Sequence, residues 1–311
     1  MAFAAFGASA GATTGGGAAR ETAPLKRSAI AIGLLAPGIV YLLLFFVTPF
    51  VSMVITSLNQ AGPTGAKGDY VLGFQWQNYV DALTQYGPHF LRSFGYSLTA
   101  TILTLLIGFP VAYFIGVTAR KWPLVQSLAL CLVIAPFFIS FLLRTLAWQH
   151  ILASNGPIVE LLQTVGLFGP TDKITGSDFA VIFGITYNYL PFMILPLYAS
   201  LERLDLRLLE AGSDLYARPA TRFFRVTLPI TMPGVVSGTL LTFIPAAGDY
   251  INSDPNYLGS PKTAMVGNVI QAQFLNAQDY PLASAVSVAL MVIILIVVAV
   301  YIRFAGTEEL V

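Results

Sequence analysis

The chain has 311 residues, of which 56% are apolar and only 10% are charged, and its formal net charge is +1. Soluble domains carry about 25% charged residues, so this composition excludes a soluble enzyme and a nucleic-acid-binding protein with a basic face, and it predicts an integral membrane protein. The single cysteine, Cys131, excludes an internal disulfide and a multi-cysteine zinc site.

The N-terminal segment, residues 1–28, is predicted to be a disordered cytoplasmic tail. It consists mostly of Ala, Gly, Ser and Thr up to residue 19, and such residues cannot bury enough side chain to offset the entropy lost on ordering. The apolar segment that follows is too long for the core of a signal peptide. A short cytoplasmic C-terminus is predicted over residues 305–311.

Six apolar segments are long enough to cross about 30 Å of hydrocarbon, which takes about 20 residues in a helix. Helices are expected because lipid offers no partner for free backbone N–H and C=O groups. Together the segments predict an all-α transmembrane domain over residues 29–304. Their approximate bounds are 29–58, 94–118, 123–143, 179–201, 226–250 and 280–302.

The distribution of Lys and Arg predicts the orientation of these spans. Eleven of these residues lie in the termini and loops of one side, and four lie in the loops of the other. Because cytoplasmic loops carry the excess of positive charge, both termini are predicted to lie in the cytoplasm.

Three outer loops contain short stretches with helical features: residues 74–83 (FQWQNYVDAL), 158–167 (IVELLQTVGL) and 266–275 (VGNVIQAQFL). Each is predicted to form a short helix on the outer face. Two interpretations remain open, namely contact with a soluble partner and packing at the membrane interface.

The sequence contains no motif for catalysis or nucleotide binding. It has no G-x-x-x-x-G-K-[ST], so the chain cannot energise transport through a P-loop of its own. It also has no H-E-x-x-H and no C-x-x-C. We therefore predict a transport protein that is not an enzyme and that holds no cofactor or metal itself.

The cytoplasmic loop between the fourth and fifth spans, residues 202–228, is the most charged part of the chain. Its apolar residues recur at three- and four-residue spacing, which predicts one face of a helix: Leu204, Leu208, Ala211 and Leu215. Arg218-Pro219 ends this helix, and a second short helix is expected over 221–226. A helical hairpin of this kind favours docking to a soluble partner over a solvated charged loop.

The same loop resembles the EAA loop of bacterial ABC-importer permeases. Glu210-Ala211-Gly212, then Tyr216, Val226 and Leu228-Pro229, have the spacing of the pattern E-A-A, three residues, G, nine residues, I, one residue, L-P. Gly212 stands where Ala is usual, and Tyr216 stands where Gly is usual. A Gly there permits a tight turn or a close approach because it has no Cβ.

Three further stretches are similar to spermidine/putrescine permeases: residues 135–148, 228–250 and 266–287. The resemblance covers most of residues 30–304. It implies the type I (MetI-like) ABC-importer permease fold, a bacterial plasma (inner) membrane location, and polyamines as the substrate.

The resemblance also implies partners. These are a second, related permease that completes a heterodimeric pore, two P-loop ATPase subunits that hold ATP and Mg, and an extracytoplasmic substrate-binding protein. It further implies that the ATPases drive the pore through a coupling helix over 206–218. The residues assigned to this coupling are Glu210, Ala211, Gly212, Asp214, Leu215, Tyr216 and Arg218.

Asp249 is the clearest polar group within the spans. It lies about 30 Å along the helix from Pro229 at about 1.5 Å per residue, near the outer end of the fifth span. With Asp254 close behind, it suits a cationic substrate that enters from outside. The alternative is an interfacial carboxylate, hydrated or paired with Arg144. Arg144 itself is expected to be structural and neutralised by a carboxylate or by capping carbonyls.

Aromatic residues complete the set of substrate-path candidates. Tyr187, Asn188 and Tyr189 either stack on and hydrogen-bond an amine or form a polar contact between helices. The full set is Asp249, Tyr250, Asp254, Tyr187, Asn188, Tyr189 and Trp148. Gly234 and Gly238 form a G-x-x-x-G for close helix packing.

Two alternatives to a polyamine permease remain. One is a related importer for ferric iron, sulfate, molybdate or phosphonate. The other is a self-contained secondary carrier, which requires buried ionisable groups near the midplane. The spans hold almost none of these groups.

Overall fold

A computed structural model describes residues 25–62, 66–169 and 172–305. Residues 1–24 of the predicted tail and 306–311 of the predicted C-terminus lie outside the described residues. Apart from one antiparallel pair of two-residue strands, β1 (Gln60–Ala61) and β2 (Tyr70–Val71), the regular structure of the described residues is helical. Gln60 lies opposite Val71 in this pair. The predicted helical fold class is therefore confirmed.

The chain divides into two compact units, Met1–Val51 and Ser52–Val311. α1 (Leu25–Leu42) continues through the π-helical turn η1 (Leu43–Val47) into α2 (Thr48–Ser57), and the first unit ends within α2. The large apolar side chains of this helix between Leu34 and Val51 are exposed. A helix that is apolar all round is typical of a membrane span, as predicted for the first segment.

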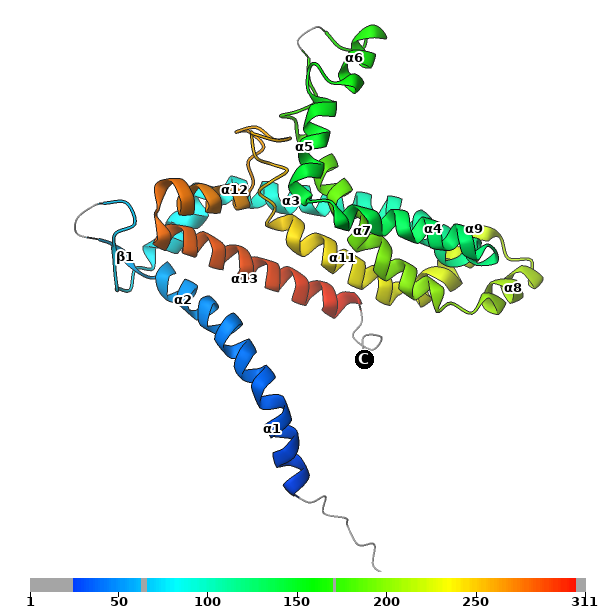
Figure 1. Cartoon of the computed structure of the whole chain (residues 1–311), viewed down its shortest axis with the longest axis horizontal. Helices are drawn as coiled ribbons and strands as arrows, with labels where there is room; N and C mark the ends of the chain where they lie inside the picture. The colour runs from blue at the N-terminus through cyan, green and yellow to red at the C-terminus, as the bar shows by residue number, and fades with distance from the viewer. Residues whose placement is uncertain (1–24, 63–65, 170–171, 306–311) are drawn as a thin grey trace, which may run out of the picture. The chain divides into compact units, whose positions relative to one another are not determined.

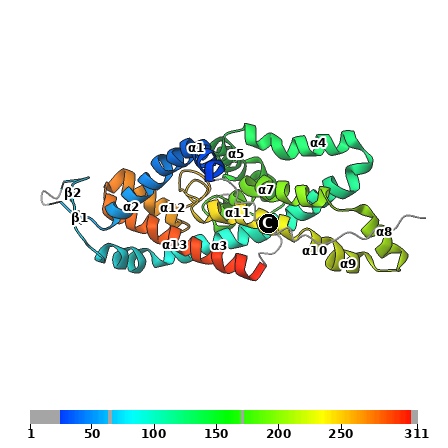
Figure 2. The ribbon, with the colours of Figure 1, turned by 90° about the horizontal axis from the view of Figure 1, so that it is seen from below.

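The second unit is built on four long helices that lie side by side (Figures 1 and 2). They are α3 (Gln77–Tyr113), α7 (Asp178–Glu202), α11 (Met232–Ala247) and α13 (Tyr280–Ala305). α3 contacts each of the other three. Met193 and Leu197 of α7 are fully buried between these helices.

Glycines allow α7 and α11 to approach closely. A Cβ placed on Gly234 would lie 2.8 Å from the Pro196 carbonyl oxygen, and one on Gly238 would lie 2.8 Å from the Met193 sulfur. Both distances are shorter than real Cβ contacts. The close packing predicted from the G-x-x-x-G spacing is therefore confirmed, and it is made with α7.

The second predicted span begins earlier than expected. α3 starts at Gln77, so most of the stretch 74–83 forms the first turns of the spanning helix rather than a separate interfacial helix. Asn78 fixes this start by donating 2.9 Å hydrogen bonds to the Ser57 and Asn59 carbonyls. At its other end, α3 continues into a π-helical turn, η2 (Phe114–Thr118), and a 3-10 turn, η3 (Ala119–Lys121).

The prediction of one continuous helix over 123–143 is wrong. α4 (Pro123–Ile134) and the 3-10 turn η4 (Ala135–Phe138) are followed by a bend of 96°, after which α5 (Phe141–Leu152) and α6 (Pro157–Thr164) leave the helix layer (Figure 1). Ile139 and Ser140 are extended here, with ψ of 133° and 136°. Pro136 lacks the N–H that would continue the α-helical ladder.

The fifth predicted span is also bent. α9 (Pro219–Arg222), the π-helical turn η5 (Phe223–Thr227) and α10 (Leu228–Ile230) meet α11 at 69°. The helices predicted at 158–167 and 266–275 are present as α6 and as α12 (Val266–Gln271) followed by η6 (Ala272–Ala277). Among the described residues, four helices are long and apolar enough to cross a membrane, or six if each bent pair is one span.

Candidate coupling hairpin and outer polar site

The predicted docking hairpin is present at one end of the second unit. α8 (Leu206–Asp214) and α9 lie together beyond the ends of α7 and α11 (Figure 2). Asp205 caps α8 because its Oδ1 accepts a 3.0 Å hydrogen bond from the Arg207 N–H. Pro219 opens α9. The coupling helix predicted over 206–218 is shorter than expected, because α8 ends at Asp214 and the chain turns at Leu215 and Tyr216.

The outward face of the hairpin is exposed in the part of the chain that the structure describes. No residue of α8 is buried. Leu208 is 46% exposed, Leu215 81% and Tyr216 97%, so of the predicted apolar face only Leu204, which precedes α8, is buried. The remaining coupling candidates are exposed apart from Gly212, which is half-buried: Glu210, Ala211, Asp214 and Arg218. This surface is available to a partner protein.

Gly212 lies against Arg222 of α9. A Cβ on Gly212 would come within 3.2 Å of the Cγ and Cδ atoms of Arg222. From this position Arg222 donates through Nη1 to the Leu209 carbonyl at 3.3 Å and to the Ser213 hydroxyl. The absence of a Cβ at Gly212 therefore lets one guanidinium join the two helices of the hairpin.

Tyr216 occupies the left-handed region of backbone space, with φ of +53°. Its N–H donates to the Ser213 carbonyl at 2.9 Å, and the Ala217 N–H donates to the Gly212 carbonyl at 3.1 Å. These bonds satisfy carbonyls that end α8, which is the usual role of a left-handed residue after a helix. The turn thus keeps the geometry that favours glycine, although it carries a tyrosine.

A second arginine joins the base of the hairpin to the end of α3. Arg120 of η3 donates to four carbonyls, those of Gly116, Leu201, Glu202 and Leu204, with a distance of 3.1 Å to Leu204. Three of these carbonyls lie at the C-terminal end of α7 and just beyond it. Helix C-termini have unpaired carbonyls and attract cations.

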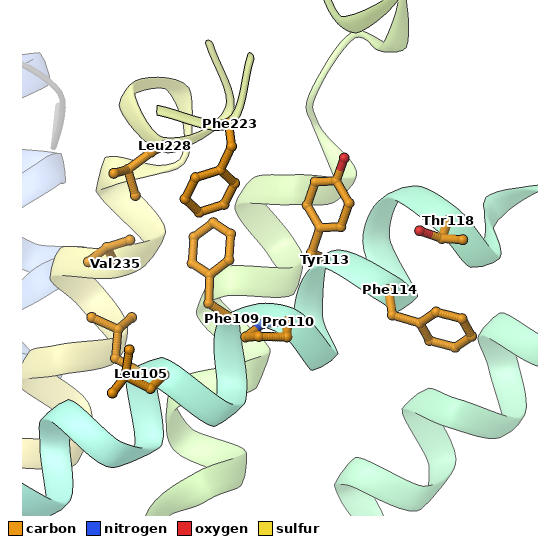
Figure 3. Close-up of a pocket in the computed structure, with 10 residues that line it drawn as sticks. Leu105, Phe109, Pro110, Tyr113, Phe114, Thr118, Phe223, Leu228 and Val235 are labelled. Atoms are coloured by element: carbon orange, nitrogen blue, oxygen red, sulfur yellow. The ribbon is translucent and has the colours of Figure 1, made fainter. Parts of the chain in front are cut away.

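An apolar pocket of about 500 Å³ lies between the C-terminal part of α3 and the bent fifth segment (Figure 3). The Phe223 ring from η5 faces Phe109 of α3, with ring centroids 5.2 Å apart in an edge-to-face arrangement. Leu228 and Val235 line the side formed by α10 and α11. The far end of the hairpin is therefore also in contact with α3.

At the opposite end of the second unit, Asp249 follows α11 and is only 5% exposed. Its carboxylate accepts hydrogen bonds from Asn252, 2.8 Å from the backbone N–H and 2.9 Å from Nδ2. The Asn252 Oδ1 in turn accepts from Asn188 of α7 at 3.0 Å and from Thr145 of α5 at 3.3 Å. A buried polar network thus links the end of α11 to two other helices.

Two glycines make room for this network. A Cβ on Gly184 of α7 would lie 2.6 Å from the Asn252 Oδ1, and one on Gly267 of α12 would lie 2.8 Å from the Asp249 carbonyl oxygen. The loop that carries Asp249 is therefore pressed between α7 and α12. Such close backbone approach is possible only without side chains at these positions.

A cavity of about 270 Å³ opens beside the network. Its lining brings three of the predicted substrate-path residues together: Asp249, Tyr250 and Tyr189. Phe141 of α5 adds a further aromatic ring. A carboxylate beside aromatic faces is an arrangement that attracts an organic cation.

The other substrate-path candidates lie elsewhere. Asn188 reaches the cavity only through Asn252. Trp148 and Tyr187 pack edge to face, 5.3 Å apart, outside the cavity lining. Asp254 caps its own turn by accepting a 2.7 Å hydrogen bond from the Asn256 N–H. Three of the seven substrate-path candidates therefore line one cavity, and their contact with a substrate stays a prediction.

The expectation for Arg144 is wrong in its detail. Arg144 is only 8% exposed, and its guanidinium lies over the Phe141 ring at 5.6 Å. Within the described part of the chain, its Nε has no hydrogen-bond partner and no carboxylate forms an ion pair with it. An aromatic face takes the place of the expected carboxylate or carbonyls.

Sequence reasoning missed four residues that join neighbouring elements within each site. In the polar network they are Thr145 and Asn252, and at the hairpin they are Arg120 and Arg222. The one signal present was Asn252 itself, a polar residue shortly after a span that ends in an acid.

No protein-family model matches the sequence. The chain is similar to the spermidine/putrescine transport system permease protein PotB of Haemophilus influenzae, with 39% identity over 75% of this chain and 80% of that protein. It is also similar to the inner membrane ABC transporter permease protein YdcU of Escherichia coli K12, with 31% identity over 71% of this chain and 72% of that protein.

Among solved structures, the fold is similar to a chain of a bacterial alginate ABC transporter in complex with an alginate pentasaccharide-bound periplasmic protein. The TM-score is 0.63 with 19% identity, over 90% of this chain and 94% of that chain. This likeness concerns the fold.

Proposed function

Because the chain belongs to the family of ABC-transporter permeases that includes the spermidine/putrescine transport system permease proteins, we propose that it forms one half of the translocation pore of a polyamine importer. A second, related permease completes the pore. The observation that carries this proposal is the α8 hairpin with its EAA-like sequence, which lies at one end of the helical unit and is exposed among the described residues.

The proposed topology has six spans in a bacterial inner membrane, with both termini in the cytoplasm. Each bent pair then counts as one span. The charge distribution supports this orientation, because the loop that carries α8 and α9 holds Arg203, Arg207, Arg218, Arg222 and Arg225. The hairpin therefore faces the cytoplasm, where ATP is available.

The proposed mechanism divides the work between subunits. Two P-loop ATPases bind ATP and Mg, and the exposed residues between Glu210 and Tyr216, in α8 and the turn after it, form the contact of this chain with them. An extracytoplasmic binding protein delivers the substrate at the opposite side, where α6 and α12 lie. Closure of the ATPases displaces α8, and the spans rearrange to open the pathway on the other side.

The Asp249 cavity supports a polyamine as the substrate. A protonated amine is compatible with a buried carboxylate, and its methylenes with the rings of Phe141, Tyr189 and Tyr250 that line the same space. The two hydrogen bonds from Asn252 hold the Asp249 carboxylate in place beside these rings.

The test is purification of the tagged chain from mild detergent with its partners, followed by reconstitution into liposomes. We expect a second permease and a P-loop ATPase to copurify, and labelled spermidine or putrescine to be imported only with ATP and the binding protein. Transport without ATP by the chain alone would contradict the importer. ATP-driven import of sulfate, molybdate or iron in place of polyamines would contradict the substrate.

A further inference from the structure

Arg120 contacts the residue that directly precedes the cap of α8. It holds the Leu204 carbonyl at 3.1 Å, and the next residue, Asp205, is the cap of α8. On its other side Arg120 belongs to η3, which continues α3 through η2 without a break. One side chain therefore connects the base of α8 to the helix that contacts α7, α11 and α13.

The shape of the guanidinium group fixes the geometry of this connection. A guanidinium is planar and presents five N–H donors at fixed angles. Arg120 uses Nε on the Gly116 carbonyl of its own segment, and it uses Nη1 and Nη2 on the carbonyls of Leu201, Glu202 and Leu204. A displacement of Leu204 therefore acts on the end of α3 through bonds that hold both segments in one orientation.

The backbones at this point leave no space for independent movement. A Cβ on Gly116 would lie 2.9 Å from the Leu201 Cβ and 3.5 Å from the Leu201 carbonyl carbon. Leu201 is fully buried in the core cluster that also contains Phe109 and Val235. The inner ends of α3 and α7 are thus in contact independently of the arginine.

The other end of the hairpin reaches the same helix. Phe223, directly after α9, packs edge to face on Phe109 of α3 (Figure 3). Both ends of the hairpin therefore contact α3, whereas the path along the chain to α11 passes through the 69° bend. α3 is the element that receives movement from both sides of α8.

We propose that Arg120 is a positioning residue that transmits the displacement of α8 to the inner end of α3. This inference rests on the proposed function, because it concerns how the ATPases drive the spans. Its role is to couple ATP hydrolysis to opening of the pathway rather than to bind substrate or nucleotide.

The test uses the complete complex in liposomes and measures ATP hydrolysed per polyamine imported. Arg120→Lys keeps the charge, but a compact ammonium with three donors does not reach four carbonyls in the same way. We expect this ratio to rise about fivefold or more, the lower end of typical coupling between sites. Lys121→Ala is the matched control, since Lys121 is exposed in the same turn and its loss removes one cytoplasmic charge.

Gly116→Ala provides an independent variant, because it separates α3 from α7 without changing the arginine. We expect it to raise the same ratio. An unchanged ratio in assembled Arg120→Lys and Gly116→Ala complexes would overturn the proposal. Failure of both variants to assemble, with normal assembly of Lys121→Ala, would assign Arg120 to folding and would also overturn it. Absence of ATP-driven polyamine import by the unmodified complex would instead contradict the proposed function.

Discussion

The stem of Arg222 fills the space that a methyl group on Gly212 would need, with the Cγ and Cδ atoms 3.2 Å from the position of such a Cβ. The EAA pattern has alanine at this position. In this chain, glycine and arginine form one joint between α8 and α9, since Arg222 also donates to the Leu209 carbonyl.

This joint predicts that substitutions at Gly212 and Arg222 are not additive. Alanine is favoured over glycine within a helix by about 1 kcal/mol. We expect Gly212→Ala to raise the unfolding temperature in an Arg222→Ala background, and to raise it less or to lower it when Arg222 is present. A double-mutant cycle on the purified chain measures this coupling. Equal effects in both backgrounds would show that the two residues act independently.

Tyr216 predicts a gain in stability on substitution by glycine. A left-handed conformation costs about 1–2 kcal/mol for a residue with a Cβ, and the Tyr216 side chain is 97% exposed and supplies no packing within this chain. We expect Tyr216→Gly to raise the unfolding temperature of the chain purified without its partners. Tyr216→Ala is the control, because it removes the ring but keeps the strained backbone. A gain of the same size in both variants would refute the explanation by strain.

Glu210 predicts a loss of coupling on charge reversal. It is exposed on α8, on the surface proposed to contact the ATPase. We expect Glu210→Arg to abolish most ATP-driven import while ATP hydrolysis continues, which uptake and phosphate-release assays on the same liposomes measure. Lys121→Ala again serves as the control for a charge change on the cytoplasmic side. Normal import by Glu210→Arg would remove the docking assignment.

Asp249 predicts a loss of apparent affinity for the amine. A hydrogen bond to a charged group contributes about 1.5–3 kcal/mol, or at least about tenfold in affinity. We therefore expect Asp249→Asn to raise the KM for spermidine by about tenfold. Because Asn lacks one acceptor oxygen, one of the hydrogen bonds from Asn252 is also lost, so assembly of the complex is measured in parallel.

Asp254→Asn is the control for this prediction. Asp254 carries the same charge nearby but caps a turn outside the cavity. We expect the KM for spermidine of the Asp254→Asn complex to stay near that of the unmodified complex. Equal changes at the two positions would favour an interfacial role for both carboxylates.

Features that depend on local spacing could be predicted from the sequence. The hairpin follows from helical periodicity, and the start of α9 follows from Pro219, which is favoured at the first position of a helix. The end of α8 at Asp214 does not follow from these signals. The close approach of α11 to α7 follows from Gly234 and Gly238, whose spacing puts both on one helix face. These signals lie within a few residues of one another.

Features that depend on contacts between distant segments could not be predicted in this way. The bend after η4 interrupts the stretch 135–143, which is apolar except for Ser140, so hydropathy gives no clear boundary at Ile139. The hydrogen bonds from Thr145 and Asn188 to Asn252 join three segments far apart in sequence. Arg144 was assigned a carboxylate or carbonyl partner because charge pairing is the usual expectation, whereas the fold supplies the Phe141 ring.

The length of α3 has a consequence for the surface outside the bilayer. Its 37 residues extend for about 55 Å at about 1.5 Å per residue, whereas the hydrocarbon layer is about 30 Å thick. Tilts of up to about 40° do not absorb this difference. One end of α3 therefore extends beyond the lipid. It begins at Gln77, whose side chain donates a 2.9 Å hydrogen bond to Asp81, and this polar pair is suited to water. In the proposed topology, the first turns of α3 set how closely the binding protein approaches the bilayer.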